Sequence, residues 1–145
     1  MNALVIPVRT AAESAFDWRA KIDRLEETLL GMPQADGKLE HQFAHGLYGR
    51  QLHIPKGTAY VGKIHRFSHF RFVLTGHLLI ITEDGQYECK APHVMVTPAG
   101  TRRVGYAYED TLVMTVHATD ETDLDAIEAE IIVPRAEQLA QELLS

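Results

Sequence analysis

The sequence predicts one mainly β domain: an antiparallel β-barrel over residues 41–118, preceded by a helical arm (1–40) and followed by a helical extension (119–145). Three observations support this prediction. Between about Phe43 and Ala118, short runs rich in Val, Ile, Tyr, Phe and Thr are separated at roughly ten-residue intervals by glycine, proline or Asp-Gly, which is typical of a sandwich or barrel. Apolar residues at helical spacing flank this region on both sides. A chain of 145 residues is also long enough to bury one core without disulfides.

The N-terminal arm contains a predicted amphipathic helix. Thr10 and Glu13 match a capping box, in which a threonine N-cap is followed three residues later by glutamate. Four apolar residues then share one helical face: Trp18, Ile22, Leu25 and Leu29. Gly31 and Pro33 end the helix, and the polar residues 33–40 are predicted to form a loop. We expect the apolar face to pack on the barrel or on a partner subunit.

The clearest hairpin signal in the barrel region is Asp84-Gly85. It lies between the strands expected at Leu78–Thr82 and Gln86–Cys89, and Asp-Gly is a preferred two-residue hairpin loop. Thr111–His117 is the predicted final strand.

After Ala118 the pattern is helical again. Leu124, Ile127 and Ile131 recur on one helical face. Three residues are candidate N-caps of this helix: Thr119, Asp120 and Thr122. Pro134 either breaks the helix or opens a second one, with Leu139 and Leu143 as its apolar stripe.

Charge is distributed unevenly along the chain, whose formal net charge is −6. Residues 41–118 carry eight basic and five acidic side chains, whereas residues 119–145 carry one basic and eight acidic. All eight histidines lie between His41 and His117. An acidic chain without a basic stripe argues against a nucleic-acid partner, and the basic, histidine-rich middle favours an anionic ligand or a metal.

The sequence also bears on cellular location. Cys89 is the only cysteine, so no internal disulfide is predicted. No run approaches the roughly 20 apolar residues of a membrane span, and the apolar start from Ala3 to Val8 is too short for a signal peptide. We therefore expect no membrane partner, and a location in the cytoplasm or in a virus particle assembled there.

Two stretches between Gly57 and Arg103 resemble the two motifs of the cupin superfamily, Gly-x5-His-x-His-x3/4-Glu-x6-Gly and Gly-x5-Pro-x-Gly-x2-His-x3-Asn. His69-Phe-Arg-Phe-Val-Leu-Thr-Gly76 is similar to the end of the first motif. Val96-Thr-Pro98-Ala-Gly100-Thr-Arg-Arg103 is similar to the second, with its proline and second glycine in place. The resemblance covers roughly half of the chain and implies a single cupin barrel, which is a double-stranded β-helix or jelly roll.

The four metal-ligand positions that the resemblance implies are altered in this sequence. His65 keeps the second histidine of the first motif, whereas His69 stands in the glutamate position. Lys63 replaces the first histidine, and Arg103 replaces the histidine of the second motif. A guanidinium cannot release its proton to bind a metal. We therefore expect a cupin scaffold with a degenerate metal site.

Further stretches resemble small phage-encoded cupin-like proteins of unassigned activity: Ile54-Pro-Lys-Gly-Thr58, Gly62-Lys-Ile-His65 and Gly100-Thr-Arg-Arg-Val-Gly-Tyr-Ala-Tyr-Glu-Asp110. This resemblance implies a phage origin, a location in the host cytoplasm or virion, and phage structural proteins as partners.

One hypothesis for function is a metal site. In a cupin, the turn between His65 and His69 would bring both imidazoles into the barrel, and His117 is the first candidate for a third ligand, ahead of His53 and His45. Such a site would hold one divalent metal (Fe, Mn, Ni or Zn) and would suit a metal-dependent oxygenase, isomerase or lyase.

A second hypothesis is a binding module for a small anionic ligand. Lys63, Arg71 and Arg103, together with the two histidines, would bind a carboxylate or phosphate. Tyr106, Tyr108 and Phe72 would form apolar walls, unless they pack in the core.

The third hypothesis is a structural or accessory protein of the virion. Its barrel would be a non-catalytic scaffold, and its terminal helices would assemble a homodimer or higher oligomer. Of the three, the sequence favours the binding module for an anionic ligand, and it leaves open whether a metal assists or the pocket is metal-free.

Overall fold

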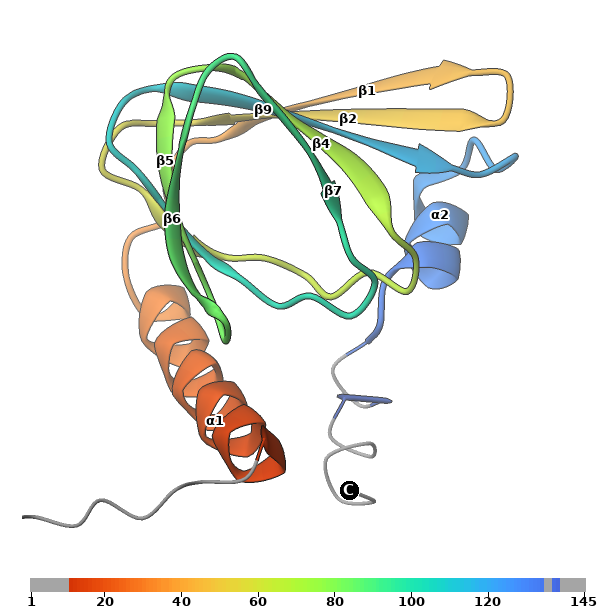
Figure 1. Ribbon diagram of the computed structural model, residues 1–145. Coiled ribbons are helices and arrows are strands. Elements are labelled where there is room, and N and C mark those ends of the chain that lie inside the picture. Colours follow the sequence, from red (N-terminus) through yellow and green to blue (C-terminus); the bar gives the residue numbers. More distant parts are fainter. Residues whose placement is uncertain (1–10, 135–136, 139–145) are drawn as a thin grey trace, which may run out of the picture.

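The computed structural model describes residues 11–134 and 137–138, and it shows a two-sheet β-barrel with helix α1 below it and helix α2 at its side (Figure 1). The elements in chain order are α1 (Ala11–Leu30), β1 (Lys38–Ala44), β2 (Leu47–Ile54), β3 (Ala59–Val61), β4 (His69–Thr75), β5 (His77–Thr82), β6 (Gly85–Lys90), β7 (His93–Thr97), β8 (Val104–Ala107), β9 (Thr111–Ala118) and α2 (Leu124–Ile131). One sheet has the strand order β1-β2-β9-β4-β7 and the other β3-β8-β5-β6, and the pairings within both are antiparallel. The predicted fold class, a mainly β jelly roll with helical extensions, is confirmed.

Helix α1 lies below the barrel in Figure 1 and has the predicted apolar face. Ile22 on this face is only 2% exposed. The three other members of the face are half-buried: Trp18, Leu25 and Leu29. Arg102, in the loop before β8, holds the helix by ion pairs with Asp23 (3.3 Å) and Glu26. The predicted capping threonine lies outside the described residues.

Strand β1 begins in the segment predicted to be a loop. Residues 38–40 pair with β2, starting at Lys38 opposite His53, so the loop prediction over 33–40 is wrong for its last three residues. The reason is that β1 is the edge strand of its sheet and almost all of its residues are exposed. An edge strand with neither face buried lacks the apolar alternation on which strand prediction depends.

The predicted hairpin is confirmed with a shift of one residue. Thr82 pairs with Gly85, so the two loop residues are Glu83 and Asp84. Gly85 itself opens β6 with a φ of +134°, a value that favours glycine. The predicted final strand is also confirmed, as β9.

Alternation along the strands divides the barrel interior into an apolar and a polar part. Val73, Leu78 and Ile80 are at most 1% exposed and belong to the main apolar core. On β4 the two inward residues before Val73 are His69 and Arg71, which are buried as well. The other end of the interior is therefore lined by polar side chains and not by apolar core residues.

Helix α2 closes the polar end of the barrel. Ile127 and Ile131 pack against the ring of Tyr48 on β2. The three predicted N-caps are wrong, because Asp123 caps the helix and its carboxylate accepts a hydrogen bond from the Ala126 amide (3.0 Å). Thr119 instead donates a hydrogen bond to Glu130 (2.9 Å).

The end of α2 and the residues after it form backbone hydrogen bonds with the loop between β3 and β4. The Arg66 amide donates to Ile131 O (2.8 Å), and the Val133 amide donates to Ile64 O (2.9 Å). Beyond it, the amides of residues 137 and 138 donate to Pro134 O (both 3.1 Å), which supports a helical turn after the proline. The predicted Leu139–Leu143 stripe lies outside the described residues. Across 11–134 and 137–138, neither helix combines the length and apolarity needed to cross a membrane.

Candidate metal and anion site

Three histidines from separate parts of the chain meet inside the barrel. His69 begins β4, His117 lies near the end of β9, and His65 lies in the loop that bridges to Ile132. Because Phe70 of β4 pairs with Val116 of β9, His69 and His117 are the next inward residues on neighbouring strands. One ring nitrogen of each histidine lies within 4.8 Å of the others. The geometry predicted for these three residues is therefore present.

Hydrogen bonds orient the three imidazoles. Nδ1 of His65 lies 3.2 Å from the carbonyl oxygen of Lys63, and Nδ1 of His69 lies 3.3 Å from that of Phe67. A carbonyl can only accept, so Nδ1 carries the proton in both rings and Nε2 keeps its lone pair. In His117, Nε2 lies 2.9 Å from Thr115 Oγ1, which leaves Nδ1 as the nitrogen without a partner.

All three imidazoles are held in the neutral form. The pKa of His65 is lowered to about 3, first by burial and then by the charges that His69 and His117 would carry. The pKa of His117 is lowered to about 4, first by burial and then by His69. Burial also lowers the pKa of His69, against a smaller opposing effect of its hydrogen bond to Phe67. Neutral imidazole is the form that binds a metal ion.

This donor set fits a divalent transition metal. Three imidazole nitrogens suit Zn, Fe, Ni or Cu, and three protein ligands leave coordination positions for an outside molecule. Lys63 is one of the two cations that stand at ligand positions implied by the cupin resemblance. It lies at the rim of the site, because its side chain is 61% exposed and its ammonium contacts Glu128 on α2 (2.7 Å). Its charge is therefore partnered at the rim of the site.

The other substituting cation, Arg103, lies beside a second buried arginine. Arg103 is 8% exposed and Arg71 is 4% exposed. Nη2 of Arg71 donates a hydrogen bond to the Tyr60 hydroxyl (2.9 Å), whereas its buried Nη1 has no hydrogen-bond partner. Burial lowers the pKa of Arg103, and the neighbouring Arg71 lowers it further. Within the described chain, neither guanidinium forms an ion pair with a carboxylate.

Two glycines make room for this arrangement. A Cβ at Gly105 on β8 would collide with the Tyr60 ring, so glycine allows the ring to lie across this strand and present its hydroxyl to Arg71. A Cβ at Gly62 would lie 3.2 Å from Cγ of Arg103, so the arginine side chain passes close over the Gly62 backbone.

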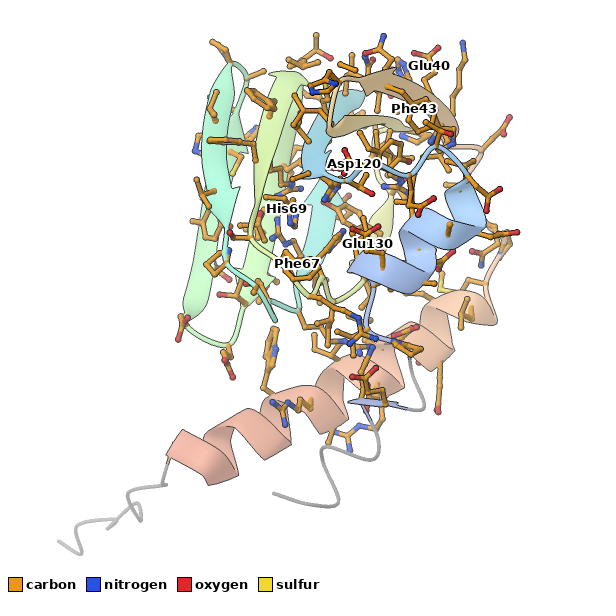
Figure 2. All side chains as sticks on the ribbon, turned by 90° about the vertical axis from the view of Figure 1, so that its right-hand side faces the viewer. Glu40, Phe43, Phe67, His69, Asp120 and Glu130 are labelled. Carbon is orange, nitrogen blue, oxygen red and sulfur yellow. The ribbon has the colours of Figure 1, made fainter. Side chains whose placement is uncertain are left out.

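The histidines and arginines line one cavity of about 480 Å³. Its walls come from the inner face of β2, β9 and β4, from residues 60–65, and from α2. Figure 2 views this end of the barrel, with His69 near the centre and α2 beside it. A larger cavity of about 990 Å³ lies between α1, the β5–β6 hairpin and the loop before β8, and it shares His65 and Arg103 with the first. Of the three histidines, His65 thus lines both cavities, whereas His69 and His117 line the smaller one.

Not every predicted site residue lies at this cavity. Tyr106 is 38% exposed and packs edge-on against Tyr108 (centroids 5.4 Å apart). Phe72 is on the outward face of β4, with Phe70 and Leu74. The aromatic walls are instead Tyr48 and Tyr60. Tyr48 is identifiable from alternation, since it begins the inward series of β2 together with Arg50 and Leu52.

The sequence matches no protein-family model and no curated protein. Among solved structures, KdgF from Halomonas sp. has a TM-score of 0.52 and 18% identity over 64% of this chain and 89% of its own. The EutQ protein of Clostridium difficile has a TM-score of 0.52 and 16% identity over 63% of this chain and 75% of its own. A cupin superfamily protein of Desulfitobacterium hafniense has a TM-score of 0.51 and 10% identity over 61% of this chain and 83% of its own. These proteins are bacterial, and the resemblance to phage proteins stays a prediction. At these identities the likeness shows the fold alone: the chain has the cupin fold.

Proposed function

We propose that this protein binds a small anionic ligand in the 480 Å³ cavity, with one divalent metal on His65, His69 and His117. The observation that carries the proposal is that three neutral imidazoles and two unpaired guanidiniums line the same enclosure. Neutral nitrogens attract a metal, and unpaired buried guanidiniums attract an oxyanion. A ligand that is both anionic and metal-binding satisfies the two groups at once.

Charge makes the anion necessary if the metal is bound. A metal on three histidines keeps its double positive charge, because no carboxylate belongs to the cluster. Arg71, the next inward residue of β4 after His69, lines the same cavity, so its positive charge would repel the metal. Anionic oxygens bound at the open positions would remove this repulsion. The bound ion would supply Lewis-acid chemistry, and an oxygenase, isomerase or lyase would use the same site.

Metal analysis of tag-free protein tests the proposal. Protein stripped with a chelator is reloaded separately with Fe, Mn, Ni or Zn, and bound metal is measured by mass spectrometry. We expect one equivalent per chain in wild type and in His53→Ala, which changes an exposed histidine outside the cluster. The His65→Ala, His69→Ala double variant should lose it. Equal retention in the double variant, or no binding of any of the four metals by wild type, would contradict a three-histidine site.

A second candidate function, assembly of copies through the barrel, is favoured by the outer face of β4 and β7. Phe70, Val94 and Val96 on this face are 52–59% exposed, and Phe70 pairs directly with Val96 across the strands. Exposed apolar clusters often mark interaction surfaces. Sedimentation analysis of wild type and of Phe70→Asp tests this function: a dimer or larger oligomer that dissociates in the variant supports it, and a wild-type monomer at high concentration refutes it.

A further inference from the structure

Arg71 and Arg103 form a charged group that is separate from the three histidines but faces the same cavity. We propose that this pair, called here the arginine subsite, binds an oxyanion without help from a metal, and that the natural ligand carries two oxyanion groups on one short carbon chain. One group would reach the metal on the histidines, and the other would lie on the two guanidiniums. This inference rests on the proposed function, because it specifies the ligand of the same cavity.

The first support is that both guanidiniums are buried without a negative partner. Arg71 is 4% exposed, its Nη1 is buried without a hydrogen-bond partner, and the described part of the chain supplies no carboxylate to either arginine. Burying an unpaired charge is costly, and two like charges side by side add to that cost. A bound oxyanion would offset this charge and would accept a hydrogen bond from the free Nη1.

The second support is that the subsite is held rigidly in place. Arg71 comes from the middle of β4, and its Nη2 is fixed by the Tyr60 hydroxyl (2.9 Å). That hydroxyl is in turn positioned because Gly105 has no side chain to displace the Tyr60 ring. Arg103 directly precedes β8, and its side chain passes close over the Gly62 backbone. A site built on strands and braced by neighbouring groups is preorganised for binding.

The spacing of the two groups limits the size of the ligand. His69 and Arg71 are alternate inward residues of β4, so their Cα atoms are about 6.6 Å apart. Both side chains line the same cavity of about 480 Å³, so a ligand that contacts both must carry its two anionic groups on one small molecule. Leu52, Ile54 and Val113 line the cavity as well and would contact the carbon chain between the groups. A dicarboxylate, or a compound with one carboxylate and one phosphonate or phosphate, has these properties.

Calorimetric titration of metal-free and metal-loaded protein tests the inference. The probes are acetate, malonate, succinate, glutarate and phosphonoacetate. We expect acetate and the dianions to bind metal-free protein through the arginine subsite, and at least one of the dianions to bind metal-loaded protein at least tenfold more tightly than acetate does. Arg71→Gln and Arg103→Gln should each weaken binding to metal-free protein at least tenfold. Arg24→Gln, which changes an exposed arginine on α1, should leave it unchanged.

The outcomes separate this inference from the proposed function. If acetate binds the metal-loaded protein as tightly as every dianion, the arginine subsite is refuted while metal-assisted anion binding stands. If no anion binds in either state, both are refuted. Tighter binding of phosphonoacetate than of the dicarboxylates would support the subsite and assign it to a phosphate-type group. The control is that near-ultraviolet circular dichroism and metal content of the arginine variants match wild type, which shows that a loss of affinity is local. Unchanged affinity in a folded Arg71→Gln variant overturns the inference.

Discussion

Mild acid should destabilise the metal-free protein because the folded state keeps His65 and His117 neutral. The pKa of His65 is lowered to about 3 and that of His117 to about 4, whereas a histidine in the unfolded chain titrates near 6.5. Below pH 6.5 the unfolded chain therefore binds protons that the folded chain does not. Stability that is fully present above this pH is lost as the pH falls toward the folded pKa values.

The loss can be estimated from these two shifts. Between pH 7.5 and pH 5.0, protonation of the unfolded state costs about 2 kcal/mol of stability for each histidine, or about 4 kcal/mol for both. That is a large part of the roughly 5–15 kcal/mol that stabilises a typical domain. The lowered pKa of His69 acts in the same direction.

Urea denaturation in the presence of a chelator measures this loss. The free energy of unfolding is determined at pH 7.5 and 5.0 for wild type, for the His65→Gln, His117→Gln double variant, and for His53→Ala. We expect wild type and His53→Ala to lose about 4 kcal/mol more than the double variant over this range. The comparison between proteins removes the contribution of carboxylates, which all three share. An equal pH dependence in wild type and double variant would refute the reasoning that burial holds these imidazoles neutral.

Three further predictions concern the framework of the site. Gly76→Ala should lower the free energy of unfolding by about 3 kcal/mol or more, because its Cβ would lie 2.5 Å from Asp110 O at a φ of +92°. Gly57→Ala, at a φ of +83° with no atom within 4 Å of the added Cβ, should cost about 1 kcal/mol. Equal losses of stability in thermal unfolding of the two variants would contradict this prediction. Tyr60→Phe removes the acceptor for Arg71 and should weaken anion binding about tenfold in calorimetry, with metal content unchanged. Asp123→Ala should cost about 1 kcal/mol in urea denaturation because α2 loses its N-cap, and Asp123→Asn, which keeps an acceptor, should cost less.

The barrel was predictable from local strand and turn patterns, whereas the histidine cluster was predicted from the resemblance to cupins. Strand composition, turn spacing and the Gly76 and Pro98–Gly100 landmarks are properties of short segments. His65 and His69 are separated by a short turn, and His117 lies on the final strand, so one topology brings all three together. The edge strand β1 was missed over 38–40 because its residues are exposed on both faces and carry no alternation.

The roles of the cations and aromatic residues depend on contacts that are distant in the sequence. Lys63 is partnered by Glu128, 65 residues later, and no local pattern predicts that pair. Tyr60 reaches Arg71 only because Gly105, on a neighbouring strand, leaves space for its ring. Tyr106 was predicted at the site, but it lies on the outward side of β8, between Gly105 and Ala107, which are buried. Which face of a four-residue strand points inward is decided by strand register, which sequence alone does not specify.

Two of the three departures from the cupin ligand set change the charge inside the site in the same direction, whereas the third, Lys63, is partnered by Glu128. His69 in the glutamate position removes a negative ligand, and Arg103 in a histidine position adds a positive group that cannot bind a metal. Arg71, buried two residues after His69, adds another. The negative charge that the motif supplies within the protein is therefore missing, and a bound metal would increase the deficit. Under the proposed function, an anion from solution would supply the negative charge that the three-histidine cluster lacks.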